Sequence, residues 1–135
     1  MRLKELLRVL ITTEMEDISV YEVEAEAFGE APGHGTAIRG LFLGLAEEKR
    51  DRLKTLRRIS KDGIGFRQRK TEAARSIEAS LRAHAARAER SAALYTSLLK
   101  ELHKPEYKEA VADMLTGERR FLEDLRALQK RIKRP

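Results

Sequence analysis

The sequence predicts an all-α protein, a bundle of four helices, on three observations. Ala, Leu, Glu, Lys and Arg dominate a chain of 135 residues that has three prolines and no tryptophan. Apolar residues recur at spacings of three and four over four segments of similar length. The breaks between these segments contain the turn-forming prolines and most of the glycines. A single domain accounts for this length.

The first predicted helix spans about residues 3–28 and ends at G-E-A-P-G-H-G, residues 29–35, where glycines and a proline stop a helix. The second spans about residues 36–60 and ends at K-D-G-I-G. Each has one stripe of residues at helical spacing, which is expected to face a core. The stripe of the first helix is Leu3, Leu7, Leu10, Glu14, Ile18, Tyr21, Ala25 and Phe28, and that of the second is Ile38, Phe42, Leu45, Lys49, Arg52, Leu56 and Ile59.

The third predicted helix spans about residues 71–102 and stops before H-K-P-E-Y, and the fourth spans about residues 106–132. The same spacing again defines one inward stripe on each. The stripe of the third helix is Leu81, Ala85, Ala88, Ala92, Tyr95, Leu99 and Leu102, and that of the fourth is Val111, Met114, Glu118, Phe121, Leu125, Leu128 and Ile132.

Charged residues interrupt three of these stripes near the middle, where apolar residues would pack better. A helix rises about 1.5 Å per residue, so charges at similar depths in neighbouring helices are expected to meet inside the bundle. Asp17, three residues after Glu14, is expected nearer the edge of its stripe. The predicted central polar site therefore consists of Glu14, Lys49, Arg52 and Glu118.

Five positions give the chain a resemblance to a known family. Glu14 lies seven residues before Tyr21 in the first helix, Phe42 is followed by Ala46 in the second, and Glu118 lies in the fourth. In this pattern the chain resembles the ferritin-like superfamily, and within it the rubrerythrin-type di-iron domains. The resemblance covers nearly the whole chain. It implies a four-helix bundle in which a crossover connects the second and third helices.

The resemblance also implies which ligands an iron site would need. In the family, a Glu from each of two helices and a Glu-x-x-His from each of the other two hold two irons. Here Lys49 stands at the Glu position of the second helix and Arg52 at its His position, and neither is a cation ligand at neutral pH. Phe121 takes the His position of the fourth helix, and the expected acid of the third falls on Ala88 or Arg87.

Two interpretations of the second helix follow. In the first, Lys49 and Arg52 compensate Glu14 and Glu118 in place of iron, unless they lie at the edge of the stripe and reach water. In the second, the helix is shifted by one residue and a di-iron site forms. Its ligands would be Glu14, Glu48, Asp51, Glu89 and Glu118.

Other ionisable residues are expected to have ordinary structural roles. An acidic run on the first helix is expected to face solvent, and the three histidines share no helix or motif that would predict a metal site. With no cysteine in the chain, disulfides and thiolate sites are excluded. The acidic run is Glu22, Glu24, Glu26 and Glu30, and the histidines are His34, His84 and His103.

A basic stretch, R-R-I-S-K-D-G-I-G-F-R-Q-R-K at residues 57–70, is the candidate for binding a polyanion. Phe66 lies among its charges as a possible stacking group. Because it matches no nucleic-acid-binding motif, nucleic-acid binding is not expected. Its candidate contact residues are Arg57, Arg58, Arg67, Arg69 and Lys70.

The function predicted from the sequence is a structural or protein-interaction role, without a working di-iron site and most simply without a cofactor. The alternative is a rubrerythrin-like di-iron oxidoreductase or iron-binding protein. A homodimer is expected by analogy with other small long-helix bundles. No apolar run approaches the roughly 20 residues that span a bilayer, so a cytoplasmic protein is expected.

Overall fold

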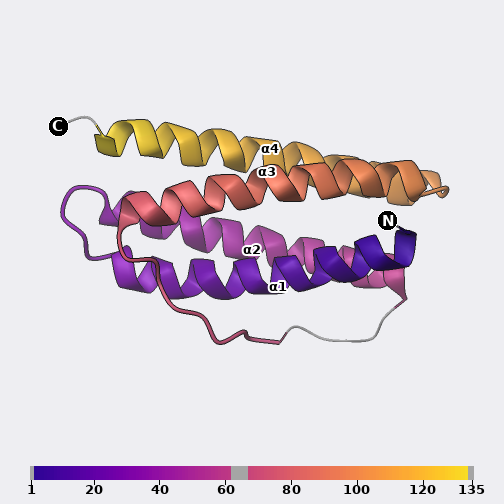
Figure 1. Cartoon of the computed structure of the whole chain (residues 1–135), viewed down its shortest axis with the longest axis horizontal. Helices are drawn as coiled ribbons and strands as arrows, with labels where there is room; N and C mark the ends of the chain where they lie inside the picture. The colour runs from indigo at the N-terminus through magenta and orange to yellow at the C-terminus, as the bar shows by residue number, and fades with distance from the viewer. Residues whose placement is uncertain (1, 62–66, 134–135) are drawn as a thin grey trace.

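The structure is a bundle of four helices, which confirms the all-α prediction. The computed structural model describes residues 2–61 and 67–133, and these residues form four helices and no strand. The helices lie side by side along the long axis of the molecule (Figure 1). They are α1 (Leu3–Phe28), α2 (Gly35–Ser60), α3 (Ile77–Glu101) and α4 (Pro105–Lys133).

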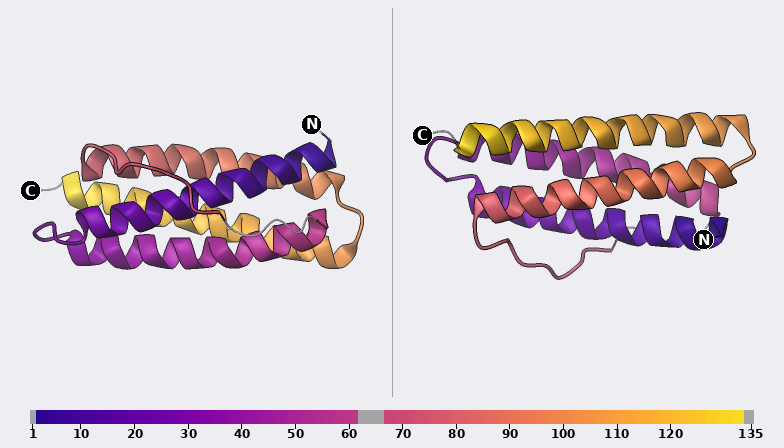
Figure 2. Two further views of the ribbon diagram at one scale, coloured as in Figure 1. Left: turned by 90° about the horizontal axis from the view of Figure 1, so that it is seen from below. Right: turned by 45° about the horizontal axis from the view of Figure 1, so that its top comes forward.

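Each helix packs against two others. α1 contacts α2 and α3, and α4 contacts α3 and α2. Figure 1 shows α1 antiparallel to α2, and α3 antiparallel to α4. The two views in Figure 2 show the same pairing from other sides. Every helix therefore has one face turned toward the centre, as the four stripes predict.

Local signals explain most of the helix ends. The side chain of Ser76 caps α3 by accepting a hydrogen bond of 3.1 Å from the amide of Ala79. Pro105 opens α4, where its missing N–H costs nothing. Lys61 ends α2 in the left-handed conformation, with φ of 59°, and its amide bonds to the carbonyl of Arg57.

The predicted start of the third helix at residue 71 is wrong, because α3 begins at Ile77. The preceding segment is held along α1 by two hydrogen bonds. The amide of Arg69 donates to Oγ of Ser19 at 2.9 Å, and the amide of Ala74 donates to Glu24 at 2.7 Å. These contacts with α1 override the helical propensity of T-E-A-A-R.

The core consists of two apolar clusters with the charged positions between them. Along α1, Leu10 belongs to one cluster and Ile18 to the other, and Glu14 lies between them. In α3 the stripe is rotated from the prediction: Ala85, Ala92 and Leu99 are only partly buried. The buried residues of α3 are Ser80, Leu81, His84, Ala88, Ser91, Tyr95 and Leu98.

Candidate functional site: a buried cluster of charges

Lys49 lies at the centre of a buried cluster of charges. Its side chain projects from α2 and is 1% exposed. Its Nζ lies 3.1 Å from a carboxylate oxygen of Glu14, 3.1 Å from one of Asp17 and 3.3 Å from one of Glu118. Because Glu14 and Asp17 are three residues apart, α1 presents both on one face. One ammonium group thus connects carboxylates of α1 and α4.

Arg52, one turn further along α2, is the second buried cation. Its Nη1 donates to Oε2 of Glu118. Its guanidinium carbon lies 4.8 Å from the centre of the Phe121 ring and 6.0 Å from that of Tyr95. The ring faces therefore add cation–π attraction to the ion pair. Glu118 accepts from both cations of α2, and this holds α4 in register with α2.

A glycine in α4 makes room for this guanidinium. Gly117 is buried, and a Cβ added to it would lie 2.7 Å from Nη2 of Arg52. A side chain at this position would therefore require the end of the Arg52 side chain to move, and Oε1 of Glu48, 3.1 Å from the same Cβ position, would be crowded as well. The sequence pattern did not single out Gly117, although a glycine inside a helix costs about 1 kcal/mol and in that sense signals a special contact.

The third ion pair of the cluster joins Asp17 to α3. The prediction that Asp17 lies near the edge of its stripe is wrong, because its side chain is only 3% exposed. Nη2 of Arg87 lies 2.5 Å from Oδ1 of Asp17, and a quarter of the Arg87 side chain reaches solvent. Arg87 occupies one of the two positions at which the resemblance expects an acid. All four helices therefore contribute, with three acids and three bases.

Burial and charge together alter the proton affinity of this cluster. Burial raises the pKa of Glu14 to about 7, with repulsion from Glu118 and Asp17 adding to the shift and Lys49 opposing it. Burial alone would lower the pKa of Lys49, but attraction by Glu14, Asp17 and Glu118 outweighs it, so the pKa is raised well above its usual value. Lys49 therefore stays charged, and Glu14 titrates near neutral pH.

The structure brings together all four residues that the sequence predicts for the central site. Glu14 and Glu118 are each about 1% exposed or less, and Lys49 and Arg52 are 1% and 4% exposed. The alternative in which Lys49 and Arg52 lie at the stripe edge and reach water is therefore wrong. Both are held inside because their carboxylate partners are inside.

The donor set does not fit the di-iron centre that the resemblance implies. Glu14 and Glu118 converge, but their oxygens are directed at Lys49, and no ion pair described for residues 2–61 and 67–133 joins either acid to an imidazole. The ring of Phe121, at the family's His position, faces Arg52 instead. Among residues 2–61 and 67–133, no group of three or more His, Cys, Asp or Glu residues is arranged to hold a metal ion.

The shifted register of the second helix is also wrong. The side chains of Glu48 and Asp51 are 46% and 74% exposed, because α2 turns Lys49 and Arg52 inward instead. Glu89 lies on the outside of α3, where it forms an ion pair with Arg126 of α4. These three acids do not join Glu14 and Glu118.

The basic stretch 57–70 is described only at its two ends. Arg57 and Arg58 belong to the last turn of α2, while Arg67, Arg69 and Lys70 are exposed in the segment along α1. Residues 62–66, and with them the predicted stacking group Phe66, lie outside the described residues. Polyanion binding by this stretch stays a prediction.

A second buried polar cluster lies near the start of α3. Glu24, expected in solvent, is 1% exposed, and His84 is 2% exposed. One oxygen of Glu24 accepts from the hydroxyl of Ser80 at 2.8 Å and lies 2.5 Å from Nε2 of His84, while the other accepts from the amide of Ala74. The expectation that this acid is solvated is wrong because residues 67–76 and α3 cover it.

The pKa of Glu24 is set by burial and by several hydrogen bonds that act against it. Burial acts to raise its pKa, but the bonds from His84, Ala74 and Ser80 stabilise the carboxylate and lower the pKa below its usual value. The sequence does carry a signal for this cluster. Ser80 and His84 lie four residues apart and share a helical face with Tyr95, which is the buried face of α3 and not the predicted stripe.

Comparison with known proteins assigns neither a family nor a function to this chain. No protein family, curated protein or solved structure matches this chain significantly. Among the helices described in the structure, none is long and apolar enough to cross a membrane. The chemistry of the two buried clusters is therefore the basis for a functional proposal.

Proposed function

We propose that this chain is a ferritin-like bundle of the rubrerythrin type whose own cations occupy the place of the di-iron centre, and that it acts as a structural or protein-interaction module. Lys49 and Arg52 neutralise the two carboxylates that the family would use as ligands. No catalytic residue is assigned, and no cofactor is required. Iron chemistry is the alternative that the experiment below tests.

One observation carries the proposal: the Nζ atom of Lys49 lies within 3.3 Å of carboxylate oxygens of Glu14, Asp17 and Glu118. A cation bound among these acids would meet an ammonium group with three protons and no lone pair. The pKa of Lys49 is raised, so its nitrogen keeps its proton at neutral pH and does not become available as a metal ligand. The acids are therefore used to hold the helices together.

Two features support the ferritin-like frame of the proposal. The motif residues Tyr21 and Phe42 are buried, with ring centres 5.2 Å apart. α2 and α3 run in the same direction in Figure 1, and residues 67–76, which precede α3 in the chain, follow α1. A bundle with a crossover between its second and third helices is expected to have this arrangement.

An interaction role needs a partner, and a homodimer is the proposed one. Val9 and Leu43 are the large apolar side chains that stand most exposed among the described residues, at 38% and 42%. Sedimentation equilibrium at micromolar concentration tests this proposal directly. A mass of one chain at every concentration would refute the homodimer and leave a heterologous partner.

The proposal about the site is tested by iron loading. The native chain and the double variant Lys49→Glu with Arg52→His are incubated with Fe(II) without oxygen, exposed to air, desalted and analysed for iron and visible absorption. The double variant restores the family's Glu-x-x-His pattern at positions 49 and 52. It is expected to be marginal without metal and to gain thermal stability when a divalent cation binds.

A native chain that stays colourless, next to a variant that takes up iron, is the expected result. The matched control replaces Lys49 and Arg52 with Met, which removes the same positive charges without adding ligands. Iron uptake by the native chain at about two atoms per chain, with the absorption of an oxo bridge, would refute the proposal and favour the alternative, a rubrerythrin-like di-iron oxidoreductase.

A further inference from the structure

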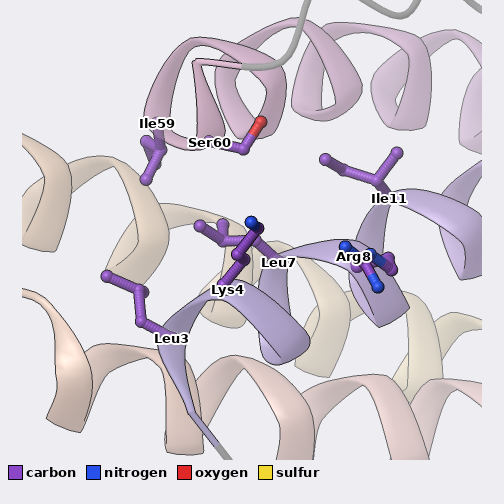
Figure 3. A pocket seen from close by; sticks show the side chains of 7 residues that line it. All are labelled: Leu3, Lys4, Leu7, Arg8, Ile11, Ile59 and Ser60. Atoms are coloured by element: carbon purple, nitrogen blue, oxygen red, sulfur yellow. The ribbon is translucent and has the colours of Figure 1, made fainter.

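A pocket of about 330 Å³ opens between the first turns of α1 and the last turn of α2. None of its lining residues belongs to either of the two buried polar clusters. Figure 3 shows the side chains around it. Its volume is at the lower end of the range for small-molecule sites, about 300 to 1,000 Å³. The pocket is lined by Leu3, Lys4, Leu7, Arg8, Ile11, Ile59 and Ser60.

The floor of this pocket is apolar and continues the core. Leu3, Leu7 and Ile11 follow one another at intervals of four residues along α1, and Ile59 faces them from α2. Leu7 and Ile59 belong to an apolar core cluster, and Leu3 and Ile11 pack against it while still partly exposed. An apolar group entering the pocket would therefore lie on the end of an existing core and cover the parts of Leu3 and Ile11 that are still exposed to water.

The rim is basic. Lys4 and Arg8 lie one turn apart on the α1 side of the pocket (Figure 3). Both are exposed, and neither forms an ion pair with another described residue. Like charges at this spacing repel each other and destabilise a helix. An anion held between the two cations would remove this repulsion.

We propose that this pocket binds a single-chain anionic amphiphile, a medium-chain fatty acid, with its carboxylate at Lys4 and Arg8 and its hydrocarbon chain on Leu3, Leu7, Ile11 and Ile59. The two cations match the head group, and the floor matches the chain. A free inorganic anion would leave the floor uncovered, and a lipid with two chains exceeds the volume. This site is separate from the central cluster, so it stands or falls independently of the proposed function.

The test is a calorimetric titration of the intact chain with hexanoate, octanoate and decanoate, each below its micelle concentration. Saturable binding of one molecule per chain is expected, and the dissociation constant should fall about fourfold per added methylene, the factor for moving a methylene from water into an apolar site. Decanol is titrated as the uncharged analogue and is expected to bind at least tenfold more weakly than decanoate.

The double variant Lys4→Gln with Arg8→Gln should weaken decanoate binding at least tenfold, because it removes both positive charges that hold the carboxylate. Both side chains are exposed, so the fold is expected to be retained. The matched control, Lys104→Gln with Lys108→Gln, removes another exposed pair at the same spacing and should change binding by less than twofold. Unsaturable uptake, equal binding of decanol, or an unchanged dissociation constant in the Lys4 and Arg8 variant overturns the proposal. Chemical-shift changes confined to Leu3, Leu7, Ile11 and Ile59 would support the location.

Discussion

Gly117 of α4 lies directly against Arg52 of α2, and the absence of a side chain at this position lets the guanidinium reach Glu118. This contact joins α4 to α2, which are far apart in the sequence. The central cluster therefore depends on the uncharged Gly117 as well as on its charged residues. The structure therefore predicts effects for substitutions inside and beside the cluster.

Gly117→Ala is expected to destabilise the protein by about 1 to 3 kcal/mol. The added methyl would lie 2.7 Å from Nη2 of Arg52, and this buried guanidinium can move away only by weakening its bond to Glu118. This loss of stability is the reverse of the usual gain from replacing a helical glycine with alanine. Gly40→Ala is the control: nothing lies within 4 Å of its Cβ position, so a gain of about 0.5 to 1 kcal/mol is expected. Urea unfolding measures both, and a gain for Gly117→Ala would contradict the contact.

Lys49→Met is expected to lower the free energy of unfolding by about 3 to 5 kcal/mol at neutral pH, since it leaves Glu14, Asp17 and Glu118 buried without their shared partner. Lys54→Met on the same helix is the control. The Lys54 side chain is 69% exposed and its nearest acid is 3.9 Å away, so its loss should cost less than about 0.5 kcal/mol. Equal effects at the two lysines would refute the central role of Lys49.

The raised pKa of Glu14 predicts how stability varies with pH. The folded state holds the proton of Glu14 up to about pH 7, whereas the unfolded chain releases it near the ordinary value of 4.5. Folding therefore takes up a proton between these values, so the contribution of Glu14 is full below about pH 4.5 and is lost as the pH rises through 7. The loss is on the order of 3 kcal/mol.

Glu14→Gln should flatten this part of the pH profile, because the amide does not titrate. Urea unfolding at a series of pH values from about 4.5 to about 8 distinguishes the two chains. The lowered pKa of Glu24 acts in a separate window: its contribution is present above the unfolded value and is lost as the pH falls through the folded one. If the native chain had as flat a profile as Glu14→Gln between these pH values, the raised pKa of Glu14 would be contradicted.

Glu24→Gln is expected to loosen the segment before α3. A carboxylate accepts on both oxygens, here from the amide of Ala74 and from Ser80 and His84, whereas a glutamine amide can accept on only one. The cost is about 1 to 3 kcal/mol. Hydrogen exchange at the Ala74 amide should speed up at least tenfold, and Glu22→Gln, which alters a partly exposed pair with Arg50, should leave it unchanged.

Much of the fold and four of the six charged residues of the central cluster could be predicted from the sequence. Helical periodicity assigns Glu14, Lys49, Arg52 and Glu118 to inward faces, and equal depth makes them meet, because both depend only on the geometry of a regular helix. The four-helix organisation follows from the same periodicity and from the glycines and prolines at the breaks.

The rest depends on contacts that periodicity does not contain. Asp17 is buried because Arg87 reaches it from α3, and the rotation of α3 is set by packing. Glu24 is buried because the segment before α3 returns along α1, and the same contact delays the start of α3 to Ile77. Gly117 matters only once Arg52 is placed. In each case the deciding neighbour is distant in the sequence.

The arrangement of three acids and three bases across four helices also acts as a selection rule for assembly. Four amphipathic helices of similar length can be packed with one helix reversed or moved by a turn while still covering their apolar stripes. In most such arrangements Glu14, Asp17 and Glu118 would lose Lys49, Arg52 and Arg87 and be buried as unmatched charges. The apolar clusters drive the helices together, and the charges between them decide which of the possible bundles forms.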